Sequence, residues 1–194
     1  MTLKHSAQIL LGKALRPIHA GEDQLLALQR EVTPARPLVL HSEAFPLGGG
    51  VPTRHVGPGA GDNVSPPLEW SGVPPQTRDL VLVCEDPDAP ALHPFIHWMM
   101  KIPPTATRLP EGLPHTAALA SFPGLEQGPN SAHLRGWFGP LPPPGHGPHH
   151  YYFQLFALDQ PITLPESADR SALLAAMTGH VIAEGHHVGV FERN

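Results

Sequence analysis

Prolines and glycines are spread through most of this chain and divide it into short apolar segments. There are 26 prolines and 19 glycines among 194 residues. They separate strand-like runs such as Leu80 to Cys84, Phe95 to Ile102 and Tyr151 to Leu158, which indicates that they occupy turns. Short strands joined by such turns predict a mainly β fold with few helices. A chain of this length is expected to form one domain with a sizeable core.

The first 34 residues differ from the rest because they contain few prolines and glycines and favour helix. Ser6 could cap a helix that ends near Pro17, and Glu22 to Val32 predicts a second helix. We therefore divide the chain into a helical N-terminal arm, residues 1–34, and a domain of residues 35–194. The leucines of the arm are expected to pack on the domain or against a second subunit, which favours a homodimer.

Composition restricts the partners and the location of the protein. A net charge of −5 and the lack of Lys/Arg clusters argue against nucleic acid. No apolar run approaches the roughly 18–20 residues of a membrane span, so no transmembrane segment is predicted. With no convincing signal peptide, the expected location is cytoplasmic. The single cysteine, Cys84, lies in an apolar strand and is expected to be buried and unreactive.

Two stretches are candidates for one small polar pocket. In the first, Val81 to Met100, two apolar strands flank an acidic turn in which prolines on both sides of Asp88 restrict the backbone. In the second, Gly145 to Asp159, a Pro/Gly-rich loop leads to His149 and Tyr151 at the start of a strand. Residues 103–148 between them show little periodicity, so we expect a long loop over the pocket.

The motifs in these stretches resemble those of a known family. DPDAP (86–90), the His97-Trp98 pair and GPHHYYFQLFALD (147–159) are similar to the two signature regions of the phosphatidylethanolamine-binding proteins. The bacterial and archaeal Raf-kinase-inhibitor-like branch is the most similar, because SPPLEWSGVP (65–74), KIPP (101–104) and the C-terminal segment also fit it. The resemblance extends over residues 39–193.

The resemblance implies a fold with a large central antiparallel sheet, a smaller second sheet and a few peripheral helices. It also implies a pocket for a small anion, such as phosphate, a carboxylate or a phosphorylated headgroup, with no cofactor. The ligand-binding residues carried over from the family are Asp86, His97, His149, Tyr151, Pro90 and Trp98. The peptide bond before Pro90 could be cis. The chain departs from the family at His150, Phe156 and Phe191, where Arg, Tyr and Tyr are usual.

The chemistry of these side chains favours binding over catalysis. Two imidazoles and a phenol can donate hydrogen bonds to an anion, while Asp86 can orient one imidazole and favour its charged form. A binding protein, with a regulatory role as one option, is therefore the leading interpretation. We interpret Asp88 as a residue that stabilises the turn. Four further histidines are expected to be on the surface or structural: His146, His150, His186 and His187.

Two alternatives remain open for the same residues. An Asp86-supported imidazole as general base, with Tyr151 as acid, could catalyse an isomerisation, cyclisation or hydrolysis. A metal site of the 2-His-1-carboxylate type could use Asp86, His97 and His149. Neither has support from a recognisable nucleophile motif or metal-binding spacing, and no metal is predicted.

Overall fold

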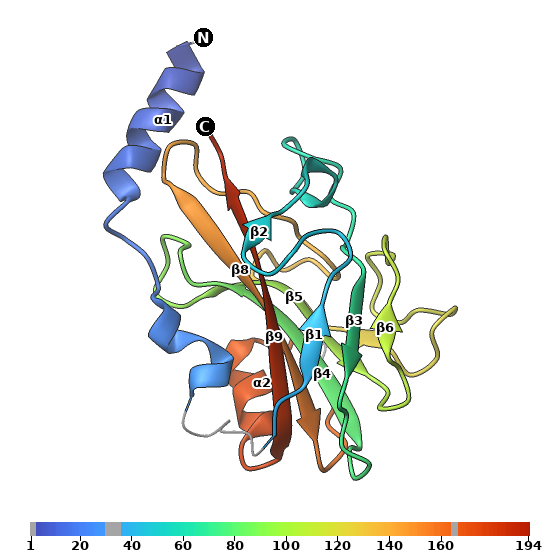
Figure 1. Cartoon of the computed structure of the whole chain (residues 1–194). Helices are drawn as coiled ribbons and strands as arrows, with labels where there is room; N and C mark the ends of the chain where they lie inside the picture. Colours follow the sequence, from blue (N-terminus) through green and yellow to red (C-terminus); the bar gives the residue numbers. More distant parts are fainter. Residues whose placement is uncertain (1–2, 30–35, 164–166) are drawn as a thin grey trace.

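The structure is a computed structural model that describes residues 3–29, 36–163 and 167–194, and it is dominated by β structure (Figure 1). The helices are α1 (Leu3–Leu15) and α2 (Arg170–Met177), with 3-10 turns η1 (Glu22–Gln24), η2 (Leu26–Leu28) and η4 (Thr53–His55). The strands are β1 (Val39–His41), β2 (Gly49–Gly50), β3 (Leu68–Ser71), β4 (Asp79–Asp86), β5 (Phe95–Ile102), β6 (Arg108–Leu109), β7 (Glu126–Gln127), β8 (Pro148–Leu158) and β9 (Val181–Glu192).

The large sheet has the strand order β2-β9-β8-β4-β5-β7. Its neighbours are antiparallel except β2, which runs parallel to β9. Strand β4 lies in the interior and is buried along its whole length. Leu82 and Cys84 face one apolar cluster and Val81 and Val83 face another, which explains the uninterrupted apolar run in the sequence.

The smaller sheet has the order β1-β3-β6 and packs over one face of the large sheet. Trp70 on β3 belongs to the core between them, and its indole Nε1 donates a hydrogen bond to the Ala106 carbonyl at 2.9 Å. On the other side, α2 places Leu173 and Met177 in the second cluster. The mainly β fold with two sheets and peripheral helices is confirmed.

Helix α2 begins and ends at residue types that favour the ends of a helix. Asp169 is its N-cap, and its Oδ1 accepts a hydrogen bond from the Ala172 N–H at 2.8 Å. Gly179, two residues beyond the helix, has φ +77°, a conformation that favours glycine. Local sequence therefore sets both ends of this helix.

The N-terminal arm differs from its prediction in two respects. Helix α1 begins at Leu3, so Ser6 lies within it and is not its cap. The predicted helix from Glu22 is also wrong, since residues 22–28 form only the two 3-10 turns η1 and η2. The reason is tertiary: the Leu26 N–H donates to Glu85 Oε2 at 2.8 Å and the Ala27 N–H to Gln154 Oε1 at 2.9 Å. Both the end of this predicted helix and the domain boundary at residue 34 lie outside the described residues.

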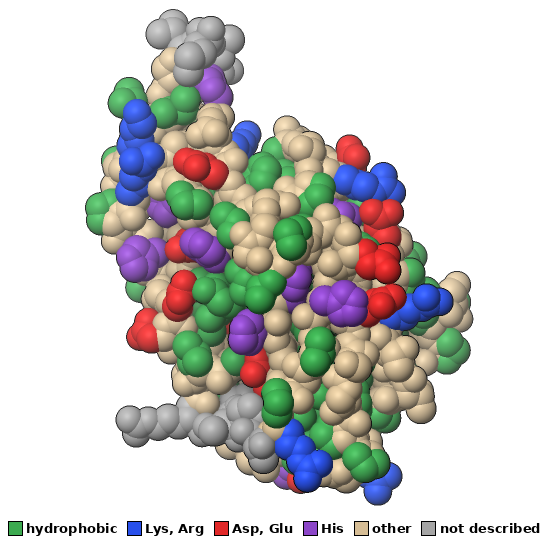
Figure 2. Space-filling view, viewed as in Figure 1, with side chains coloured by type: hydrophobic (Ala, Val, Ile, Leu, Met, Phe, Trp, Pro, Cys, Tyr) green, Lys and Arg blue, Asp and Glu red, His purple; other side chains and the backbone are tan. Residues whose placement is uncertain are grey.

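The leucines of the arm are divided between the domain and the surface. Leu25 and Leu26 are buried on the domain, as one alternative predicted. Leu10 and Leu11 on α1 are 68% and 60% exposed, and α1 extends beyond the sheets (Figure 1 and Figure 2). A subunit contact through α1 stays a prediction. Within the described part of the chain, no helix is long and apolar enough to cross a membrane.

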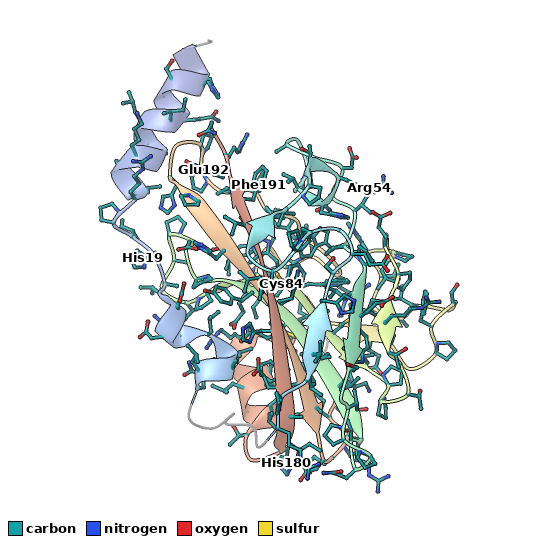
Figure 3. All side chains as sticks on the ribbon, in the orientation of Figure 1. His19, Arg54, Cys84, His180, Phe191 and Glu192 are labelled. Atoms are coloured by element: carbon teal, nitrogen blue, oxygen red, sulfur yellow. The ribbon has the colours of Figure 1, made fainter. Side chains whose placement is uncertain are left out.

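Cys84 should be unreactive in the folded protein. It lies within the central strands of the large sheet (Figure 3), fully buried, and burial followed by the nearby Asp86 raises the pKa of its thiol well above the ordinary value. Because the thiolate is the reactive form, we expect no labelling by a thiol-specific reagent under native conditions and one equivalent in denaturant. Rapid native labelling would show that the strands around Cys84 open readily.

Candidate ligand pocket

A pocket of about 220 Å³ lies where the C-terminal end of β4 and the N-terminal ends of β5 and β8 meet. One side is polar and consists of Asp86, His97 and His149. The rest of the wall is apolar and consists of Ala89, Pro90, Phe95, Phe138, Leu141, Pro142 and Pro143. The last four residues come from the segment that was expected to cover the pocket.

Asp86 is the centre of the polar side. Its Oδ1 accepts a hydrogen bond from the Asp88 N–H at 2.9 Å, and its Oδ2 accepts one from His149 Nδ1 at 2.7 Å. His97 Nε2 lies 3.7 Å from the same Oδ2. Burial alone would raise the pKa of Asp86, but the hydrogen bonds and charges of His149 and His97 lower it to about 2. The side chain is therefore a carboxylate at neutral pH.

His97 has one nitrogen engaged and one facing the carboxylate. Its Nδ1 contacts the carbonyl oxygen of Phe138, which can only accept, so Nδ1 carries a proton. Its ring also packs against Phe95, with the centroids 4.8 Å apart. These contacts hold the ring in place and leave Nε2 near Asp86 without a normal hydrogen bond.

Tyr151 lies beside His97 but is not part of the pocket wall. Its ring meets the His97 ring edge-on at 5.0 Å, and its hydroxyl is buried without a hydrogen-bond partner in the described structure. Burial, then the charge of Asp86, raises the pKa of the Tyr151 phenol well above its ordinary value. The hydroxyl thus keeps its proton and can donate a hydrogen bond.

Of the two remaining predicted ligand-binding residues, Pro90 lines the pocket and Trp98 does not. Pro90 lies in the pocket wall, but the described residues contain no cis peptide bond, so the cis alternative is wrong. Trp98 does not line the pocket: it is buried in the core, where its Nε1 donates to Gln127 Oε1 at 2.8 Å. The two residues His97 and Trp98 do not alternate regularly, because the pairing of β4 and β5 passes from Cys84–Trp98 to Glu85–Ile96 and leaves His97 without a partner. Both rings pack against Trp137, with centroid distances of 6.3 Å for His97 and 5.6 Å for Trp98.

Two histidines have roles that sequence reasoning did not assign. His146 is buried, and its Nδ1 lies 2.8 Å from His149 Nε2. In the sequence, the histidines of the short GHGPHH segment were the available sign that His146 and His149 lie close together. His150 is bound to Asp88, whose Oδ2 accepts from both the His150 backbone N–H and ring Nδ1, at 2.7 and 2.8 Å. Asp88 therefore ties the acidic turn to β8, which is more than the expected local stabilisation.

The arrangement gives little support to the metal alternative. Asp86 and His149 direct polar atoms at each other, and His149 directs its second nitrogen at His146. Among the residues that the structure describes, no group of three or more His, Cys, Asp or Glu side chains is placed to hold a metal ion.

The fold and this pocket define a class of mainly β protein with a buried Asp–His cluster at the strand ends. A family model described as phosphatidylethanolamine-binding protein matches residues 41–192. The chain therefore belongs to the phosphatidylethanolamine-binding protein family, as the sequence motifs suggested.

Individual relatives agree with this assignment. A UPF0098 protein of Methanothermobacter thermautotrophicus is 40% identical over 155 residues, 79% of this chain and 98% of the relative. YbcL of Escherichia coli, a solved member of the family, has a TM-score of 0.76 at 31% identity, covering 81% of this chain and 99% of YbcL. A homologue from Chlamydia trachomatis gives 0.71 at 33% identity, covering 82% and 100%.

Proposed function

We propose that this protein binds a small anion, either a free ion such as phosphate or a carboxylate, or a phosphorylated headgroup. The observation that carries the proposal is the Asp86–His97–His149 cluster in a pocket of about 220 Å³. A pocket of this size suits a small polar group. The apolar wall excludes water and so strengthens electrostatic interactions inside.

His97 is the donor best placed for such an anion. When the ring is charged, Nε2 also carries a proton, and its distance of 3.7 Å from the Asp86 carboxylate is too long for a good hydrogen bond, so this proton is available to a ligand. When both His97 and His149 are protonated, their two positive charges exceed the one negative charge of Asp86. An anion then gains a charge-assisted hydrogen bond and completes the charge balance.

The same contacts argue against His149 as a general base. An Asp–His pair such as Asp86 and His149 orients an imidazole as a general base in many enzymes. Here, however, both nitrogens of His149 are engaged, one by Asp86 and the other by His146. A general base needs a free nitrogen directed at the substrate, and this geometry gives His149 none.

Binding can be tested by thermal unfolding in phosphate, sulfate, acetate and phosphoethanolamine. We expect at least one of them to raise Tm, because ligand binding to the native state stabilises it. At about 100 times Kd the gain is about 2.7 kcal/mol, or about 5–10 °C for a protein of this size. His97→Ala should abolish the rise, since it removes the donor.

His186→Ala is the matched control, because His186 also lies on a strand of the large sheet but is 57% exposed in its side chain. It should behave like the wild type. An equal rise in His97→Ala would place the anion elsewhere. No rise with any of the four anions would contradict the proposal.

A further inference from the structure

Helix α1 packs directly on the loop that forms one wall of the pocket. Its Gly12 is so close to this loop that an added Cβ would lie 2.0 Å from the Pro144 carbonyl oxygen. Just beyond the helix, Arg16 Nε donates a hydrogen bond to the Gly145 carbonyl at 2.9 Å. The neighbouring Pro143 lines the pocket. The helix thus fixes the position of the wall.

The segment after α1 contacts the opposite wall. The Ala20 N–H donates to the Ala89 carbonyl at 3.2 Å, and the Gly21 N–H donates to the Pro87 carbonyl at 3.0 Å. Ala89 also lines the pocket. One continuous segment of the arm therefore joins both loops that frame the candidate ligand site.

A chain of hydrogen bonds runs from α1 to the carboxylate in the pocket. The carbonyl of Leu15, the last residue of α1, lies 3.0 Å from His146 Nε2. His146 Nδ1 lies 2.8 Å from His149 Nε2, and His149 Nδ1 lies 2.7 Å from Asp86 Oδ2. Three consecutive contacts thus connect the end of the helix to the centre of the pocket.

The groups at the two ends of this series of hydrogen bonds determine how many protons the two imidazoles carry. The Leu15 carbonyl and the Asp86 carboxylate only accept, so His146 Nε2 and His149 Nδ1 both carry protons. The contact between the two rings then needs a third proton, because two bare nitrogens cannot form a hydrogen bond. With all three bonds formed, the imidazole pair carries one positive charge next to Asp86. Other ionisable side chains near these groups include His97 on β5, Arg16 after α1, Asp88 in the acidic turn, and His150 and Tyr151 on β8.

We propose that the N-terminal arm contributes to anion binding by positioning His149. The Leu15 carbonyl and His146 hold His149 in place, so anion affinity falls when the arm is detached. His146 is then a positioning residue, since it acts through His149. The inference rests on the proposed anion binding. It concerns a segment that precedes the family match, which begins at residue 41.

Detaching the helix provides the first test. In Gly12→Ala the new methyl group cannot fit against Pro144, so α1 must move away from the pocket loop while every pocket side chain is kept. We expect phosphate to bind about tenfold more weakly by isothermal titration calorimetry, the cost of losing a hydrogen bond to a charged group. Gln8→Ala, on an exposed part of the same helix, is the matched control and should bind like the wild type.

Replacing His146 provides the second test, with a readout that a purely structural role would not change. In His146→Ala the ring nitrogens of His149 should give the ¹⁵N NMR signals of a neutral imidazole with its proton on Nδ1. In the wild type they should show the additional shared proton. In His146→Gln the amide N–H can reach the Leu15 carbonyl while the amide oxygen accepts from His149. This variant should recover most of the roughly tenfold affinity lost in His146→Ala.

The outcomes separate this proposal from the proposed function. If the wild type binds phosphate but Gly12→Ala and His146→Ala bind equally well with unchanged His149 signals, the role of the arm is refuted and anion binding stands. If the wild type binds no phosphate, sulfate, acetate or phosphoethanolamine, the anion function fails. The His149 signals in Gly12→Ala then decide alone whether the arm controls His149.

Discussion

Arg170→Met is expected to lower the free energy of unfolding by about 3 kcal/mol, because it leaves a buried carboxylate without its charge partner. Glu85 is fully buried, and its Oε1 accepts a hydrogen bond from Arg170 Nε at 2.8 Å. Its Oε2 keeps the Leu26 N–H and the Gln154 amide in the variant, both at 2.8 Å. These remaining donors place the loss at the lower end of the usual range for a broken buried pair. Urea unfolding monitored by circular dichroism measures it.

An exposed ion pair of similar geometry supplies the control. Arg54 Nε lies 2.8 Å from Glu111 Oε1, but the two side chains are 56% and 39% exposed, and Arg54 is at the outer edge of the molecule (Figure 3). Arg54→Met should change stability little, since water already screens this pair. Adding Glu85→Gln to Arg170→Met should recover part of the loss. Equal stability of the two single variants would contradict the role assigned to the buried pair.

Protonation of Asp86 is expected to cost about 2 kcal/mol of stability in acid. The folded-state pKa of Asp86 is lowered from the ordinary 3.8 to about 2, so the unfolded chain binds this proton first as the pH falls. The contribution is therefore fully present above about pH 5 and is lost progressively as the pH approaches 2. Below the folded-state pKa it has disappeared.

Asp86→Asn isolates this contribution from the other carboxylates. The amide cannot ionise, so the variant lacks the pH-dependent term while keeping an oxygen that can accept the Asp88 N–H. The difference in unfolding free energy between wild type and variant should shrink by about 2 kcal/mol from pH 5 to pH 2. A difference independent of pH would show that the imidazoles do not stabilise the carboxylate.

The candidate site was largely predictable, but its details were not. The motifs named Asp86, His97 and His149, and the structure brings all three together in one pocket. Trp98 was placed in the site with its neighbour, but it lies in the core. The irregular pairing of β4 and β5 at His97 is a tertiary feature that the sequence pattern did not indicate. His146 could not be assigned, because its partner on the other side is a backbone carbonyl about 130 residues earlier in the chain, at Leu15.

The sequence by itself determined the parts of this protein that depend on local patterns. Apolar runs bounded by turn residues define β4, β5 and β8, and Asp169 defines the start of α2. Only the tertiary structure decided where long-range polar contacts prevail. The segment from Glu22 has the leucine spacing of a helix, yet it forms 3-10 turns because Glu85, which lies far along the chain, binds its backbone. A buried carboxylate must be satisfied by donors, and that requirement outweighs a helix propensity of a few tenths of a kcal/mol per residue.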